Sequence, residues 1–293
     1  SILIPIYNFK VIPFVNELEV QCSSLNIDFE IRCYEDGSSK EWANQNIALQ
    51  NKLNVNYQII QKNLGRSAIR NKMSAEAKYD WQLFFDCDAE ISNSNFIKNY
   101  VSFCSEKPCV VFGGRSYADS PPKETDKLLR WKYGVEREVF SIDIRNTAPY
   151  KYFMTNNFLV HRSIVESIQF NTDITGYGHE DTMFAIDLKN NKTTLHHINN
   201  PLLHIGLETS SEFLSKTKQG VKNLALLIKN KNIDKENKLY KTYDNIKSWH
   251  SIWIINFSLY ILLRLIVRNL KSSNPNIKMF DLFKLKHLLN YFS

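Results

Sequence analysis

Short β-like runs and longer helical stretches alternate along the first half of the chain. Runs with the length and composition of β-strands occupy residues 2–6, 29–34, 55–60, 81–85 and 109–112. Stretches with helical spacing of apolar positions lie between them, at residues 10–21, 39–53, 66–78 and 93–105. We expect Ser92 or Asn93 to cap the last helix. This alternation predicts an α/β fold with a doubly wound sheet, whose ligands bind at loops after the carboxyl ends of strands.

The alternation ends after residue 113. Pro121, Pro122 and Gly134 interrupt a basic and aromatic stretch, which we expect to lie on the side of the second substrate. Regular patterns return at residues 152–161 and 164–168. They lead into the loop Gly176-Tyr-Gly-His-Glu-Asp181 and a further helix.

The last third of the chain has a helical pattern. Thr209-Ser-Ser-Glu212 has the spacing of a capping box and predicts a helix that continues to about residue 230. The polar residues 229–241 indicate a hinge, and residues 252–267 form a mostly apolar run. We therefore predict one domain over residues 1–208 and a helical region over residues 209–293.

Composition indicates a folded protein that favours an anionic partner. The 293 residues are 43% hydrophobic and 23% charged, and the formal net charge is +7, with much of the excess after residue 215. Such a charge suits a phosphate-rich ligand, an anionic membrane or nucleic acid. Because no helix-turn-helix, zinc-finger or RNA-recognition motif accompanies it, we do not expect a nucleic-acid partner.

Cysteine usage indicates a reducing compartment. The five cysteines form no CxxC pair and no regular framework: Cys22, Cys33, Cys87, Cys104 and Cys109. We therefore expect a cytoplasmic protein.

An acidic pair gives the strongest chemical signal. The apolar strand Trp81-Gln-Leu-Phe-Phe ends in Asp86-Cys-Asp88, so two carboxylates lie in alternate positions at its carboxyl end. Hard cations such as Mg²⁺ and Mn²⁺ favour oxygen ligands and share them with substrate phosphates. Taken alone, the pair is also typical of a solvated turn.

Other polar motifs precede the acidic pair. The first strand ends in Pro5-Ile-Tyr7-Asn, and the second is followed by Asp36. Arg66 and Arg70 are four residues apart, so they lie on one face of a helix, where the alternative interpretation is a solvated basic face.

This ordered set resembles the family 2 glycosyltransferases, which have the GT-A type fold, over roughly residues 1–208. The resemblance implies a nucleobase pocket lined by Pro5, Tyr7 and Asp36, in which Asp36 accepts an N–H of the base. A pyrimidine base, and hence a UDP-linked donor, is the expectation.

The resemblance also implies how the diphosphate is held. Arg66 or Arg70 would reach the base or the phosphates, and Asp86 would contact the ribose. Asp88 would bind the divalent cation, Mn²⁺ or Mg²⁺, directly.

The loop that ends at Asp181 resembles the Gly-rich Glu-Asp loop of inverting members, including the galactosyltransferase-like branch. Asp181 would then be the base that removes the proton from the acceptor hydroxyl, and Glu180 would hold or orient the acceptor. The alternative is a helix start, where acidic residues interact favourably with the helix dipole. Both interpretations can hold together.

Further residues are candidates through their positions. His204 corresponds to the histidine that many relatives supply to the metal after a strand, although a lone histidine is often structural. Asn156 and Asn157 resemble the segment bordering the acceptor pocket. Trp131 and Tyr177, with Tyr133, could stack on sugar rings, and the alternative for them is packing.

An aromatic stripe marks the C-terminal apolar run. Its members recur every three or four residues: Trp249, Trp253, Phe257 and Tyr260. Three cations flank it: Arg264, Arg268 and Lys271. The run is shorter than the roughly 20 residues of a membrane-spanning helix, so we expect peripheral contact with an anionic membrane, on the inner face of the cell membrane. Packing within the chain is the alternative.

The motifs together predict an inverting transfer of a sugar from a nucleotide donor to a hydroxyl of a saccharide or lipid-linked saccharide in surface glycan synthesis. The alternatives are a retaining transferase of the same fold and an inactive relative that binds glycans or tethers a membrane. A sugar-nucleotide pyrophosphorylase is disfavoured because Pro5-Ile-Tyr7-Asn lacks a glycine-rich phosphate loop.

Overall fold

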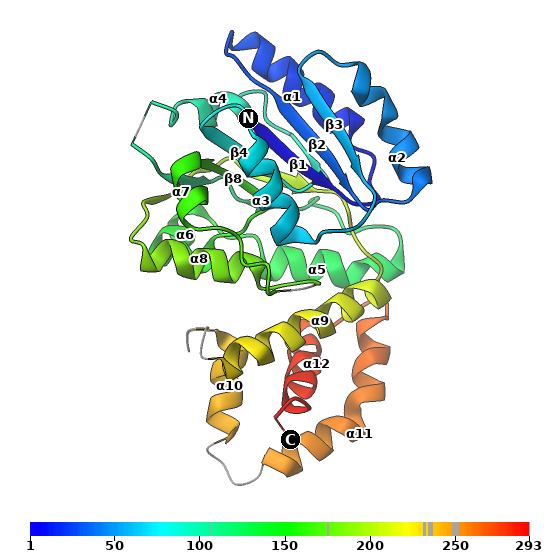
Figure 1. Cartoon of the computed structure of the whole chain (residues 1–293). Helices are drawn as coiled ribbons and strands as arrows, with labels where there is room; N and C mark the ends of the chain where they lie inside the picture. Colours follow the sequence, from blue (N-terminus) through cyan, green and yellow to red (C-terminus); the bar gives the residue numbers. More distant parts are fainter. Residues whose placement is uncertain (106, 175, 231–232, 234–236, 248–251, 293) are drawn as a thin grey trace. The chain divides into compact units, whose positions relative to one another are not determined.

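The computed structural model describes the chain except for residues 106, 175, 231–232, 234–236, 248–251 and 293 (Figure 1). The chain forms two compact units. Unit 1 consists of Ser1–Ala118, Val139–Asp173 and Glu180–Gly206, and unit 2 of Asp119–Glu138, Ile174–His179 and Leu207–Ser293. The sequence predicted one boundary after residue 208. The structure begins the last segment of unit 2 at Leu207 and adds two earlier segments to that unit.

Unit 1 is built on a mixed sheet that has seven strands in the described residues, in the order β3-β2-β1-β4-β8-β6-β9. Its strands are β1 (Ile2–Ile6), β2 (Ile31–Asp36), β3 (Val55–Ile60), β4 (Trp81–Phe85), β6 (Val110–Phe112), β8 (Asn157–His161) and β9 (Leu195–His197). Strands β1, β2, β3 and β4 run parallel, and β8 runs antiparallel to β4 and β6. The predicted doubly wound mixed sheet is therefore confirmed.

A second, smaller sheet begins with a strand that closely follows β4 in the sequence. Its strands are β5 (Ala89–Glu90), β10 (Leu202–His204) and β7 (Arg115–Ser116), with β10 between the other two. This sheet brings together three segments that are far apart in the sequence.

Helices cover both faces of the large sheet (Figure 1). One core contains side chains of α1 (Ile12–Ser24) and α4 (Phe96–Val101), and the other those of α3 (Arg66–Glu76), α7 (Arg162–Ser167) and α8 (Glu180–Asn190). Successive strand residues alternate between the two cores: Ile4 belongs to the first and Leu3 to the second. The remaining helices of this unit are α2 (Lys40–Asn46), η1 (Ile47–Asn51), α6 (Ile142–Thr147) and η3 (Pro149–Tyr152).

Two helix predictions differ from the structure. The stretch 39–53 divides into α2 and the 3₁₀ helix η1. Helix α4 begins at Phe96 with Asn95 as its N-cap, so the predicted cap at Ser92 or Asn93 is wrong. Asn93 instead accepts the backbone N–H of Asn95, which forms a turn before the helix.

Unit 2 is helical in its described residues. Its helices are η2 (Thr125–Lys127), α5 (Leu128–Arg137), α9 (Ser210–Lys229), α10 (Lys238–Lys247), α11 (Ile252–Leu270) and α12 (Ile277–Leu289). The predicted capping box is confirmed, because Thr209 and Glu212 exchange both hydrogen bonds at the start of α9. Parts of the predicted hinge at 229–241 lie outside the described residues, and α10 begins within that range.

Candidate functional site

The motifs of unit 1 gather at the point where the sheet reverses its strand order. Strand β1 has β2 on one side and β4 on the other, both parallel to it. Tyr7 follows the carboxyl end of β1, and Asp86 and Asp88 follow that of β4. Such a switch point is where open α/β sheets bind their ligands.

The small sheet positions His204 beside Asp88. His204 pairs with Ala89, and the backbone N–H of Ile205 donates to the Asp88 carbonyl at 3.0 Å. His204 Nδ1 consequently lies 3.4 Å from Asp88 Oδ1. A Cβ on Gly206 would lie only 2.5 Å from the Asp88 Cβ, so this close approach requires glycine.

The charged groups around Asp88 keep its carboxylate ionised. Burial alone would raise its pKa, but the positive charges of His204, Arg115 and Arg66 hold the pKa of Asp88 well below its usual range. Its Oδ1 atom is buried and accepts no hydrogen bond within the described part of the chain. An ionised carboxylate fits a divalent cation whose remaining ligands come from a diphosphate, and His204 would add a ligand only as a neutral imidazole.

Protein ligands alone would not complete such a site. Among the described residues, no group of three or more His, Cys, Asp or Glu side chains is arranged to hold a metal ion. That Asp88 and His204 share the cation with phosphate oxygens stays a prediction.

Arg70 connects the two acidic motifs of the sequence. Its side chain is 2% exposed, and its Nη2 donates to Asp86 Oδ1 at 2.8 Å. Its Nη1 lies 4.0 Å from Glu180 Oε1, and Arg66 Nη1 donates to the same oxygen at 3.1 Å. The carboxyl end of β4 and the start of α8 therefore belong to one charged site.

Glu180 lies in ion-pair contact with Arg66 and Arg70, which the sequence did not reveal. Burial would raise its pKa, but the charges of Arg66 and Arg70 hold the pKa below its usual range, so the carboxylate stays ionised. It holds the two arginines on one side of the site. Its predicted role in orienting the acceptor stays a prediction.

Asp181 has the protonation behaviour of a base that works near neutral pH. Burial, together with the charge of Glu180, raises the pKa of Asp181 to about 6, although the backbone N–H of Thr182 donates to its Oδ1 at 2.7 Å. Glu180 and Asp181 are also the first two residues of α8. The helix-start interpretation is therefore confirmed, and it leaves the catalytic one open.

Asp36 orders the loop in front of α3. Its two carboxylate oxygens accept the backbone N–H groups of Leu64 and Gly65 at 2.6 and 3.1 Å, and burial raises its pKa. A base N–H would have to share these oxygens. Pro5 lies in β1, and Tyr7 is 56% exposed at the same edge, where it can contact a ligand.

The two asparagines of the predicted acceptor segment differ. Asn157 is fully buried, and its amide contacts Tyr100, Gly114 and Asn200, which is a structural role. Asn156 accepts the backbone N–H of Asp86 through its carbonyl, while its buried Oδ1 has no hydrogen-bond partner within the described residues. Asn156 is the better ligand candidate.

Arg115 is a site residue that the sequence did not single out. Its Nη2 lies 3.1 Å from His204 Nδ1 and 3.9 Å from Asp86 Oδ2. Its position after Gly113-Gly114, at the end of an apolar run, was the available signal. Trp131 and Tyr177 belong to unit 2 and are half-buried, so their predicted stacking on sugars stays a prediction.

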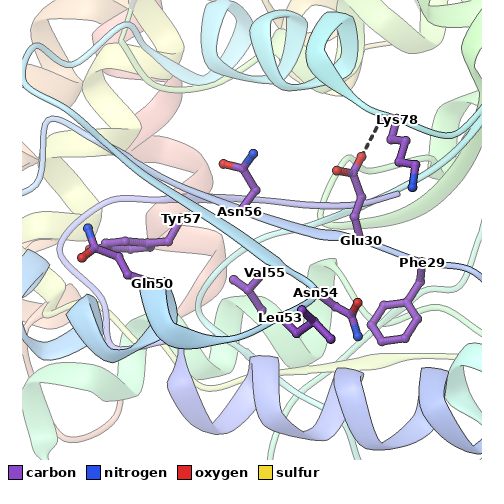
Figure 2. Close-up of a pocket in the computed structure, with 9 residues that line it drawn as sticks. All are labelled: Phe29, Glu30, Gln50, Leu53, Asn54, Val55, Asn56, Tyr57 and Lys78. Carbon is purple, nitrogen blue, oxygen red and sulfur yellow. Dashed lines mark hydrogen bonds between the residues drawn. The ribbon is translucent and has the colours of Figure 1, made fainter.

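A groove of about 480 Å³ lies at the opposite edge of the sheet, by the amino ends of β2 and β3 (Figure 2). It is lined by Phe29, Glu30, Gln50, Leu53, Asn54, Val55, Asn56, Tyr57 and Lys78. None of the predicted site residues lines it.

Solved structures with a similar fold are glycosyltransferases. Glucosyl-3-phosphoglycerate synthase from Mycobacterium tuberculosis, in complex with Mn²⁺, UDP and glucosyl-3-phosphoglycerate, has a TM-score of 0.52 and 15% identity over 80% of each chain. A mannosyltransferase from Pyrobaculum calidifontis with GDP-Man and Mn²⁺ has a TM-score of 0.51 and 13% identity, covering 99% of this chain and 83% of its own. These likenesses confirm the GT-A fold.

TarS from S. aureus is also similar, with a TM-score of 0.51 and 16% identity over 82% of this chain. This chain spans only 41% of that TarS chain, and 64% of TarS 1-349 in complex with UDP. A direct search of curated protein sequences gave no match. The model of glycosyl transferase family 2 matches residues 1–169, more than half of the chain, and this protein therefore belongs to glycosyl transferase family 2.

Proposed function

We propose that this glycosyltransferase moves a sugar, with inversion, from a UDP-linked donor to a hydroxyl of a saccharide or lipid-linked saccharide in the synthesis of a surface glycan. The proposal further assigns the transfer a divalent cation, Mn²⁺ or Mg²⁺. Two similar structures, which contain a nucleotide and Mn²⁺, support the donor class and the cation.

The observation that carries the proposal is the position of Arg70 between Asp86 and Glu180. Donor binding alone would need only the acidic pair after β4. The same guanidinium also reaches the start of α8, where Asp181 has a pKa of about 6. This arrangement supports a site in which the acidic pair would hold the donor and Asp181 would act as the base on the acceptor, as an inverting transfer requires.

Asp88 and His204 would hold the cation, which would neutralise the charge of the leaving diphosphate. Arg66 and Arg70 would position the phosphates, because guanidinium groups bind phosphate oxygens in paired geometry. Asp86 would contact the ribose, and Tyr7 the base. The chain's own residues would thus fix the donor before the acceptor binds.

Asp181 would accept the proton of the acceptor hydroxyl as that oxygen attacks the anomeric carbon. A base with a pKa near 6 is ionised at neutral pH and still has a measurable affinity for the proton. Asn156 would contact one of the two substrates through its unpartnered Oδ1.

The test is a screen of UDP- and GDP-linked sugars for release of nucleoside diphosphate, with Mn²⁺, with Mg²⁺ and with a chelator. The proposal expects release from a UDP-sugar that needs the cation. Binding of UDP and Mn²⁺ without release, in the presence of a broad set of acceptors, would favour the inactive glycan-binding or membrane-tethering alternative. Release of free diphosphate from UTP and a sugar 1-phosphate would instead indicate a pyrophosphorylase.

Product stereochemistry separates the inverting from the retaining alternative. From an α-linked UDP-sugar, the proposal expects a β-linked product, identified by the coupling constant of its anomeric proton. An α-linked product would contradict the role of Asp181 as a base acting directly on the acceptor.

A further inference from the structure

Helix α11 is apolar on nearly its whole circumference. One face contributes Leu259, Ile266 and Leu270 to the core of unit 2, against α12. The opposite face holds exposed apolar side chains: Trp253, Ile254, Phe257, Tyr260, Ile261 and Leu265. A helix that is apolar all round is normally buried or in contact with lipid.

The structure leaves the opposite face of this helix exposed. Trp253, Phe257 and Ile261 are 68%, 61% and 60% exposed. Of the described helices, α11 alone is long and apolar enough to cross a membrane by length and composition. Only 11% of its most apolar 18-residue stretch is buried. The alternative that the aromatic stripe packs inside the chain is therefore wrong for Trp253, Phe257 and Tyr260, while Trp249 lies outside the described residues.

The exposed face continues into a basic end. Phe257, Ile261, Arg264 and Arg268 follow one another at spacings of four, three and four residues, so they lie on one side of the helix. Residues 252–271 contain no Asp or Glu. Both arginines are exposed, and neither forms an ion pair within the described part of the chain.

The basic residues of the chain are concentrated in the same region as this helix. Residues 207–293 hold 15 of the 37 lysines and arginines but only 6 of the 30 aspartates and glutamates. The rest of the chain holds more acidic than basic residues. The positive net charge therefore belongs to the part of the sequence that carries the exposed apolar helix.

We infer that the exposed face of α11 binds the surface of an anionic lipid bilayer. The side chains of Trp253, Phe257 and Ile261 would enter the boundary between headgroups and acyl chains, and Arg264 and Arg268 would contact anionic headgroups. This surface is independent of the transfer reaction and does not rest on the proposed function.

Two other arrangements fit the observations less well. A second copy of the chain would bring the same unpaired arginines to the contact, and this face of α11 has no acidic residue to pair with them. A spanning helix would have to withdraw Leu259, Ile266 and Leu270 from the core of unit 2. Arg264, in the second half of the helix, would also be costly in the interior of a bilayer.

The test is co-sedimentation of the full chain with vesicles, measured without donor or cation. Vesicles of phosphatidylcholine containing phosphatidylglycerol are compared with vesicles of phosphatidylcholine alone. We expect binding to the anionic vesicles that weakens as salt is added, and little binding to the neutral ones. Equal binding to both, or binding to neither, would overturn the inference.

Two sets of variants separate the apolar and the basic contributions. Replacing Trp253, Phe257 and Ile261 by serine should reduce binding to anionic vesicles to the low level that the wild-type protein shows with neutral vesicles. The double variant Arg264→Gln/Arg268→Gln should weaken binding roughly 30-fold, because each cation near an anionic surface strengthens binding by about fivefold.

Matched controls carry the same changes at exposed positions of unit 1. The apolar control replaces Val20, Leu53 and Ile144 by serine, and the basic control is Lys40→Gln/Lys107→Gln. Thermal unfolding curves verify that every variant folds. If a control weakens binding as much as its α11 counterpart, the assignment of the surface to α11 is wrong.

Sedimentation equilibrium without vesicles tests the second copy as the occupant. A monomer that binds anionic vesicles supports the inference. A dimer that the serine variant dissociates, together with absence of vesicle binding, would overturn it. Because neither measurement depends on sugar transfer, failure here leaves the proposed function unaffected.

Discussion

The two edges of the large sheet differ in their charged residues, and this difference underlies our assignment of the chemistry to the carboxyl edge. The carboxyl edge, after β1 and β4, concentrates charge: Arg70 and Glu180 are buried, Asp86, Asp88 and Arg115 are half-buried, and ion pairs join all of them except Asp88. The amino edge has a groove of about 480 Å³ in which Glu30 and Lys78 are the charged lining residues (Figure 2).

The presence of a groove is therefore not enough to assign the binding site of a nucleoside diphosphate to the amino edge. Burying several charges together is costly unless each is paired, so a fold has reason to keep such a cluster where a charged ligand completes it. At the groove, Glu30 is already paired with Arg32 at 3.1 Å, and the polar lining other than Glu30 and Lys78 is neutral. Four predictions test this contrast, beginning with the largest effect.

Replacing Asp88 by Asn should reduce sugar transfer by roughly 10³-fold or more, because loss of a cation ligand removes several kcal/mol of charge stabilisation in the transition state. Steady-state kinetics with Mn²⁺ measures the effect. Asp28→Asn, at an exposed position just before the groove's Phe29, is the matched control and should retain normal turnover. Near-normal turnover of the Asp88 variant would show that Asp88 does not take part in the reaction.

Replacing Asp181 by Asn should lower kcat by roughly 10²- to 10³-fold through loss of the base, with little change in UDP binding. Asp187→Asn, on the same helix, is the control for altered charge and folding. A defect confined to KM for the donor would contradict the assignment of Asp181 to the acceptor.

The pH profile of kcat should follow Asp181. Its pKa of about 6 lies above the usual range of a carboxyl group, and the base acts only when ionised. Activity should therefore be full well above pH 6 and fall about tenfold for each pH unit below it. A flat profile down to pH 5 in a protein that stays folded would show that another group accepts the proton.

Changes in the groove should have the smallest effect. Asn56→Ala, at an exposed position of β3 within the groove, should alter transfer and UDP binding by less than about twofold, as surface substitutions away from a site usually do. A large loss of donor binding in this variant, without a loss of stability, would reverse the contrast between the two edges.

The sequence predicted the parts of the molecule that depend on local pattern. Strands β1, β3 and β4 have the predicted bounds because each is a short run with the composition of a strand between polar turns. The acidic pair was found in the same way, since it directly follows the run that forms β4. The capping box at Thr209 was another purely local signal.

Features that depend on distant contacts were missed. Arg115 reaches the site only because β7 pairs with β10, a contact between segments almost ninety residues apart. Asn157 resembled an acceptor residue, but contacts with Tyr100 and Asn200 give it a structural role. Helix α12 was not predicted, and unit 2 takes segments from three separate parts of the chain.

Titration calorimetry of UDP with and without Mn²⁺ tests the central claim most directly, because it probes the carboxyl edge without requiring the acceptor. We expect the wild-type protein to bind UDP tightly only with Mn²⁺, and we expect Asp88→Asn to lose the contribution of the cation while Asn56→Ala retains it. Cation-independent binding of UDP, or equal binding by the Asp88 variant, would contradict the account.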